Sequence, residues 1–322
     1  MSILMDITSL TVKEMRSKLD KKEISSPELT KAYLERIKNV DGKLESYITV
    51  TEEKAMAAAE AAQAKIDAGE ASPLCGIPLA IKDNICTEDV KTTCASKMLE
   101  NFIPPYNATV MDKLESQDIV MLGKTSMDEF AMGGSTQTSA FKKTKNPYDT
   151  ARVPGGSSGG SAAAVGADLC AAALGSDTGG SIRQPSSFCG VTGLKPTYGR
   201  VSRYGLVAFA SSLDQIGPIA RSAEDCGMIL NAIAGYDPHD GTVSKNPVDD
   251  YTSKIGMSMK GVKIAVPAEF YAEGIDDVVR KTVLAAADSY KAMGAELVEC
   301  SMPSLKSVSY THLRAHETKA NL

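Results

Sequence analysis

The chain has 322 residues, with 43% hydrophobic and 23% charged residues and a net charge of −5. This balance is ordinary for a soluble globular protein and excludes an overall basic face for nucleic acid. No apolar run reaches the ~18 residues that a bilayer crossing needs, and the N-terminus lacks a signal-peptide core. The seven cysteines form no Cys-x-x-Cys pair, which argues against a disulfide framework or a zinc site. We therefore expect a cytoplasmic protein with no membrane contact and no bound metal.

The first 70 residues are predicted to be helical. Ser26-Pro27-Glu28 combines a capping residue, a proline suited to a first helical turn and an acid that favours the helix N-terminus. Thr51 is predicted to open another helix through an alanine-rich run to about Ala68. The segment is interpreted either as a packing or partner-binding element or as ordinary core helices.

Apolar runs typical of buried strands then alternate with helical patterns. The predicted strands are 76–85, 119–122, 169–174, 262–266 and 296–298, the predicted helices are 161–167, 222–234 and 276–293, and 126–139 is predicted to run from loop into helix. This order predicts an α/β fold, with a mixed, mostly parallel central sheet covered by helices and a helical N-terminal part. We expect a single domain over residues 1–306 and a non-native tail over 307–322, which has no apolar periodicity.

Two glycine-serine loops, Gly155–Ser161 and Gly175–Ser181, are the most informative feature of the sequence. Glycine permits positive φ angles and close backbone approach, so such loops can aim several N–H groups at one point. A serine that ends such a loop is a candidate nucleophile with an oxyanion hole beside it. A pair of tight turns or a flexible linker is the alternative interpretation. Neither loop carries a nucleotide-phosphate pattern.

A serine nucleophile needs a base, and histidine is scarce in this chain. The three histidines are His239, in a turn-like segment, and His312 and His316, in the last eleven residues. Lysine is the other residue that becomes a base when desolvation lowers its pKa. Lys82 lies in an apolar, strand-like run near glycine-rich segments and is the candidate base.

A proton relay follows if Ser157 lies between Lys82 and Ser181. A hydroxyl can accept one hydrogen bond and donate another, so Ser157 would pass the nucleophile's proton to the lysine. The backbone N–H groups of Thr178, Gly179, Gly180 and Ser181 are the candidate oxyanion donors.

Three segments carry a resemblance to a known family. Ile81–Asn84, Pro154–Ser161 and Asp177–Gln184 resemble the signature of the amidase signature family. The resemblance implies that fold, with Ser181 as the acyl-forming nucleophile, Ser157 as a bridging serine after a cis peptide, and Lys82 as the base. We expect Asp177 and Arg183 to support the nucleophile loop.

Residues 127–135, 190–206 and 210–218 further resemble the glutaminase subunits of tRNA-dependent amidotransferases. That resemblance implies that the chain hydrolyses glutamine and passes ammonia to a tRNA-binding kinase subunit. The kinase subunit would use ATP and Mg to amidate Glu-tRNA(Gln) or Asp-tRNA(Asn). The glutaminase subunit would need no cofactor and would also bind a small third subunit in a heterotrimer. A stand-alone amidase acting on another amide is the alternative.

The resemblance ends near residue 305, whereas the family continues. The family's continuation carries an arginine and an aspartate that bind the α-carboxylate and α-amine of glutamine. We therefore expect a C-terminally truncated chain with little glutaminase activity.

Overall fold

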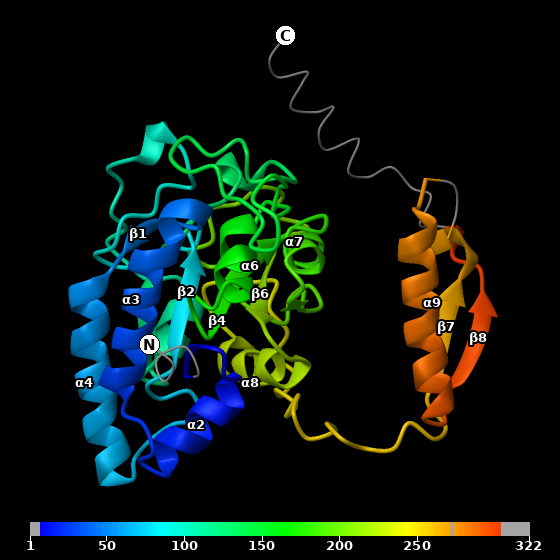
Figure 1. The fold of residues 1–322 in the computed structure, drawn as a ribbon, viewed down its shortest axis with the longest axis horizontal. Coiled ribbons are helices and arrows are strands. Elements are labelled where there is room, and N and C mark those ends of the chain that lie inside the picture. Colours follow the sequence, from blue (N-terminus) through cyan, green and yellow to red (C-terminus); the bar gives the residue numbers. More distant parts are fainter. Residues whose placement is uncertain (1–6, 272–273, 304–322) are drawn as a thin grey trace. The chain divides into compact units, whose positions relative to one another are not determined.

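The computed structural model describes residues 7–271 and 274–303, which fall into two compact units, Met1–Ser253 and Lys254–Leu322 (Figure 1). The single domain over residues 1–306 stays a prediction. The predicted tail over 307–322, with His312 and His316, lies outside the described residues.

The first unit contains a six-stranded sheet and the helices that cover it. Its helices are α2 (Val12–Asp20), α3 (Ser26–Leu44), α4 (Glu52–Ala68), α5 (Thr109–Glu115), α6 (Gly159–Gly166), α7 (Arg183–Phe188) and α8 (Ala223–Ile233), with short 3₁₀ turns η1 (Lys97–Leu99) and η2 (Glu129–Ala131). Its strands are β1 (Tyr47–Val50), β2 (Pro78–Lys82), β3 (Val120–Thr125), β4 (Ala172–Asp177), β5 (Thr192–Gly193) and β6 (Gln215–Ala220).

Capping residues fix where the N-terminal helices begin. Ser25 caps α3 through a capping box with Glu28, so the cap lies one residue before the predicted Ser26. The predicted helical segment 1–70 is interrupted by β1, whose β-branched and aromatic residues pair with β3. The helix predicted from Thr51 to about Ala68 is confirmed as α4.

Several further local predictions differ from the structure. The strand predicted over 76–85 is the shorter β2, and the strand predicted over 119–122 is β3, which continues to Thr125. The strand predicted over 169–174 is β4 at Ala172–Asp177, because its pairing with β6 continues through Asp177. Residues 126–139 form only the short turn η2. Here the buried Asp128 carboxylate accepts hydrogen bonds from Ser135 and Thr138 and holds the segment as a loop.

The sheet has the strand order β1-β3-β2-β4-β6-β5 and is mixed, as predicted, but it is not mostly parallel, because three of its five strand pairings are antiparallel. Strand β2 pairs in parallel with both β3 and β4, whereas β1–β3, β4–β6 and β5–β6 are antiparallel. Strands β2 and β4 are fully buried; α4 packs against β3, α6 against β4 and α8 against β6 (Figure 1). Since β2 and β4 are parallel neighbours, their carboxyl ends bring Lys82 close to residues 175–177.

The second unit contains a parallel strand pair, β7 (Lys263–Pro267) and β8 (Glu296–Cys300), with η3 (Ala268–Tyr271) and the helix α9 (Asp277–Ala292). The βαβ unit predicted over 262–298 is therefore confirmed, and its two strands form a sheet of their own. Among residues 7–271 and 274–303, no helix combines the length and the apolar character that a membrane crossing requires.

Candidate active site

The two glycine-serine loops meet beside the carboxyl ends of β2 and β4. The peptide bond between Gly156 and Ser157 is cis, as the sequence resemblance implies. The backbone N–H of Ser158 donates to the carbonyl of Ser181 at 3.1 Å, which joins the two loops directly. The N–H of Gly156 donates to the Gln184 side chain at 2.9 Å, which ties the first loop to α7.

Lys82 is fully buried at the end of β2. Its Nζ atom donates to Ser157 Oγ at 2.7 Å, to Ser176 Oγ at 2.9 Å and to the Ser176 carbonyl at 3.3 Å. Burial lowers the pKa of Lys82 to about 7, although the carboxylates of Asp128, Asp177 and Asp214 act in the opposite direction. A large fraction of this amine is therefore neutral at physiological pH and able to accept a proton.

Ser181 lies in the turn between β4 and α7 and is half-buried. Among the hydrogen bonds of the described residues, none involves its hydroxyl. Of the predicted relay, the structure forms the Lys82–Ser157 hydrogen bond and leaves the Ser181 hydroxyl free to approach a substrate. Hydrogen bonds to a nucleophile are often long before substrate binds and tighten in the complex.

Asp177 organises the nucleophile turn from its centre. Its buried carboxylate accepts hydrogen bonds from the backbone N–H of Gly180 at 2.7 Å and of Ile182 at 3.0 Å, and from the Arg183 guanidinium. Burial raises the pKa of Asp177, but hydrogen bonds from Arg183 and from these N–H groups outweigh it and lower the pKa below its ordinary value. Asp177 is therefore ionised, and Arg183 contacts it from a half-exposed position.

The predicted oxyanion donors differ in whether their N–H groups are already hydrogen-bonded within the protein. The N–H of Gly180 is occupied by Asp177. In the part of the chain that the structure describes, the N–H groups of Thr178, Gly179 and Ser181 make no hydrogen bond. These three remain available to a substrate oxygen.

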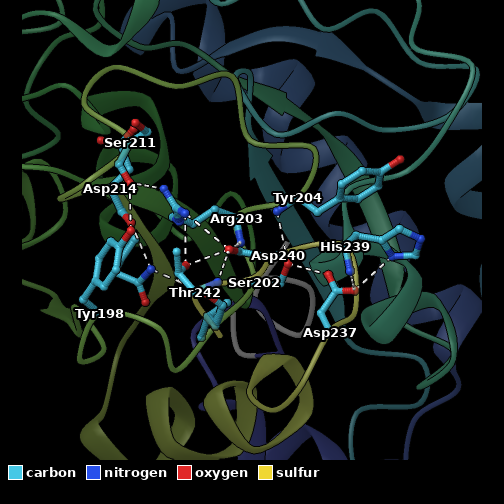
Figure 2. Close-up of polar contacts among 12 residues, drawn as sticks. Tyr198, Ser202, Arg203, Tyr204, Ser211, Asp214, Asp237, His239, Asp240 and Thr242 are labelled. Atoms are coloured by element: carbon cyan, nitrogen blue, oxygen red, sulfur yellow. Dashed lines mark hydrogen bonds and ion pairs between the residues drawn. The ribbon is translucent and has the colours of Figure 1, made fainter. Parts of the chain in front are cut away.

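Figure 2 shows a polar network that includes Asp214 and His239. The hydroxyl of Thr178 donates to the buried carboxylate of Asp214, which also accepts the Phe209 N–H at 2.9 Å. His239, the one histidine that the structure describes, hydrogen-bonds to Asp237 at 3.0 Å and stacks on Tyr204. Its side chain contacts neither glycine-serine loop through these interactions, in agreement with the choice of lysine over histidine as the base.

Sequence reasoning missed four polar residues around these groups. They are Asn84, Asp128, Ser176 and Asp214, all buried. Asn84 lies two residues after Lys82 and Ser176 directly precedes Asp177, so both lie in or beside the segments that carry the family resemblance. Asp128 and Asp214 lie in the segments 127–135 and 210–218, which carry the further resemblance, but their roles depend on hydrogen bonds that form only in the folded protein.

A buried lysine with a lowered pKa, hydrogen-bonded to a serine and accompanied by a second serine on a glycine-rich turn, has the composition that a serine–lysine acyl-transfer site requires. Comparison with protein families then assigns the chain to a family. The family model described as Amidase matches residues 28–321, so the similarity continues past residue 305, where we expected it to end. The chain belongs to the amidase family.

The relatives are close in sequence and in structure. The chain is 58% identical over 321 residues to the A subunit of glutamyl-tRNA(Gln) amidotransferase of Ruminiclostridium cellulolyticum, covering 99% of this chain and 66% of that protein. The crystal structure of the corresponding A subunit of glutamyl-tRNA(Gln) amidotransferase from Thermotoga maritima is 43% identical with a TM-score of 0.82, covering 98% of this chain and 67% of that one. Native peptide amidase from Stenotrophomonas maltophilia is 33% identical with a TM-score of 0.83, covering 91% of this chain and 62% of that one.

The chain thus spans slightly less than two thirds of the length of the first of these relatives. The match to both solved structures confirms the predicted α/β amidase fold.

Proposed function

We propose that this chain is the glutaminase subunit of a tRNA-dependent amidotransferase. It hydrolyses glutamine through an acyl-enzyme on Ser181 and supplies ammonia for the conversion of Glu-tRNA(Gln) to Gln-tRNA(Gln), or of Asp-tRNA(Asn) to Asn-tRNA(Asn). The observation that carries the chemistry is the 2.7 Å hydrogen bond between a fully buried Lys82 and Ser157. The choice of reaction rests on the names of relatives that are 50–58% identical.

Acylation begins with neutral Lys82. Ser181 Oγ forms a bond to the amide carbon of glutamine, while its proton passes to Ser157 and the Ser157 proton passes to Lys82. When the tetrahedral intermediate collapses, the carbon–nitrogen bond breaks and Lys82 returns its proton through Ser157 to the leaving nitrogen, which departs as ammonia. Water then attacks the ester by the same proton path, releasing glutamate and restoring Ser181.

The developing oxyanion is assigned to the turn that carries the nucleophile. The N–H groups of Thr178, Gly179 and Ser181 are the proposed donors, and Gly180 shapes the turn through its bond to Asp177. Loss of one such donor costs roughly 10²–10³ in rate. Asp177 and Arg183 are positioning residues in this proposal, because they hold the turn and act through it.

The proposal includes a division of labour within a larger complex. The chain itself uses no cofactor, whereas ATP and Mg are bound by a tRNA-binding kinase partner, and a small third protein completes a cytoplasmic heterotrimer. A net charge of −5 favours a partner that binds most of the tRNA.

Reconstitution with the two partner proteins tests this function. Ammonia release from glutamine should rise when the tRNA-binding kinase partner, ATP and Glu-tRNA(Gln) are added, and Ser181→Ala should abolish it. Unchanged turnover of the Ser181→Ala complex would overturn the nucleophile assignment. Steady hydrolysis of simple amides by the isolated chain, unaffected by the partner, would instead favour a stand-alone amidase.

A further inference from the structure

Behind Lys82 lies a polar pair that the mechanism above does not use. Asn84 Nδ2 donates to Ser176 Oγ at 3.0 Å, and Lys82 Nζ donates to the same oxygen at 2.9 Å. Asn84 and Ser176 are buried, with 1% and 5% of their surface exposed. The other amide atom of Asn84, Oδ1, is buried and has no partner among the described residues. A buried amide oxygen without a hydrogen-bond partner destabilises the folded protein. We therefore ask what the hydrogen bond from the Asn84 side chain to Ser176 Oγ contributes to the site.

The geometry around Nζ matches the charged form of the lysine. An ammonium group has three N–H donors and no acceptor. The structure supplies three acceptors for them: Ser157 Oγ, Ser176 Oγ and the Ser176 carbonyl. The ammonium formed when Lys82 takes up the nucleophile's proton is thus fully hydrogen-bonded in its buried position.

The neutral amine has two N–H donors and one lone pair. The Ser176 carbonyl can only accept and therefore takes one N–H. If Ser176 Oγ accepts the second, the lone pair is left for the Ser157 hydroxyl, which is the arrangement that proton transfer requires. Asn84 donates to Ser176 Oγ and holds this oxygen as an acceptor next to Lys82.

We propose that Asn84 and Ser176 are positioning residues that direct the lone pair of Lys82 at Ser157 and stabilise the ammonium formed during acylation. The inference rests on the proposed function, because it assigns partners to the base named there. It concerns the side chain of Ser176 alone. The backbone of Ser176 is held separately, since its N–H donates to Ser158 Oγ at 3.3 Å and its carbonyl accepts from the same hydroxyl at 3.1 Å.

This independence makes Ser176→Ala a specific perturbation. The strand keeps its backbone contacts, while the ammonium loses one of its three acceptors. A hydrogen bond to a charged group is strong enough that acylation should become about 10- to 100-fold slower. The pKa of Lys82 should fall further, because the hydrogen bond that the charged form loses is stronger than the one that the neutral form loses.

Acylation is best followed with a fluorophosphonate, a probe that needs no glutamine-binding elements. Ser181 Oγ forms a bond to phosphorus and fluoride leaves, while the Ser181 proton passes through Ser157 to Lys82. The labelling rate plotted against pH gives a midpoint that reports the protonation of the base. The ionisable groups that act on Lys82 are Asp128, Asp177, Asp214 and Cys94, and none of them is changed in these variants.

The inference predicts opposite shifts for two variants of the full chain. Ser176→Ala should move the midpoint about one unit lower, and Ser176→Thr, which keeps the hydroxyl, should restore it. Asn84→Asp should move it higher, because a carboxylate favours the charged lysine. Ser161→Ala is the matched control: it removes a buried hydroxyl that contacts Leu174 and Thr125 instead of Lys82, and it should leave the midpoint unchanged.

A slower Ser176→Ala variant with an unshifted midpoint would overturn the inference and leave the proposed function intact. The proposed function fails separately if the wild-type chain is not labelled, or if labelling survives in Ser181→Ala. Either result would contradict the assignment of Lys82 as the base, and this inference would fail with it.

Discussion

Replacement of Lys82 by methionine is expected to stabilise the chain at neutral pH while removing the proposed base. Burial lowers the pKa of this lysine from 10.5 to about 7. In the unfolded chain the amine stays protonated up to its ordinary pKa, so folding must either release the proton or bury the charge. At about 1.36 kcal/mol per pH unit, this costs roughly 5 kcal/mol at pH 7 and below.

The pH dependence of this cost has a defined sign. Because the folded-state pKa is the lower one, the penalty is fully present below about pH 7 and disappears as the pH rises to 10.5. Methionine removes the penalty but leaves the hydroxyls of Ser157 and Ser176 without their amine partner, at about 1–3 kcal/mol. The net gain is therefore about 2–4 kcal/mol near pH 6.5 and shrinks to zero near pH 9.

Urea unfolding followed by circular dichroism measures this gain. Wild type and Lys82→Met are compared between about pH 6 and pH 9.5, so that ionisations common to both cancel. Lys124→Met is the matched control, because Lys124 is equally buried but lies 3.6 Å from the buried carboxylate of Asp83. Lys124→Met leaves the Asp83 carboxylate without its ion-pair partner and should lower the free energy of unfolding by about 3–5 kcal/mol. A difference between wild type and Lys82→Met that does not vary with pH would refute the reasoning.

Two further substitutions, each compared with a control substitution, test the loops. Gly156→Ala should abolish fluorophosphonate labelling, because a Cβ atom at this position would overlap the Asp128 carboxylate; Gly134→Ala, whose nearest neighbour would lie at 3.9 Å, should retain it. Asp177→Asn should lower the free energy of unfolding, measured in urea at pH 7, by about 2–3 kcal/mol, since charge-assisted hydrogen bonds are lost. Arg183→Ala should lower it by less than about 1 kcal/mol, because the Arg183 side chain is half-exposed. Because the folded-state pKa of Asp177 is lowered, its contribution is present above about pH 3.8 and lost as the pH falls further, so the stabilities of wild type and Asp177→Asn should converge in acid. Equal stability of these two proteins at pH 7 would count against Asp177 as the organiser of the turn.

Much of the site could be predicted because its chemistry is concentrated in short segments. The scarcity of histidine, a lysine in an apolar run and two glycine-serine loops were enough to select Lys82, Ser157 and Ser181, and the structure brings the first two into contact. The cis peptide before Ser157 was available only through the family resemblance, since no local pattern of glycine and serine requires it.

The remainder depends on long-range contacts that a local pattern does not encode. Asp214 contacts Thr178 across 36 positions of sequence, and Ser176 cannot be distinguished from the other residues of the second glycine-serine loop until its contact with Lys82 is seen. The antiparallel pairing of β6 with β4 extends that strand beyond its apolar run, which is why the predicted strand ended too early. The hydrogen bond from the Gly180 N–H to the Asp177 carboxylate likewise forms only when the turn is folded, so no local pattern predicts it.

The central claim is that Lys82 activates Ser181 through Ser157. Peptide mapping of the fluorophosphonate-labelled chain by mass spectrometry tests it most directly, with wild type, Ser157→Ala and Lys82→Met labelled side by side at pH 8. We expect one adduct, on Ser181, in the wild type and its loss in both variants. An adduct on another serine, or full labelling of Ser181 without Ser157 or Lys82, would contradict it.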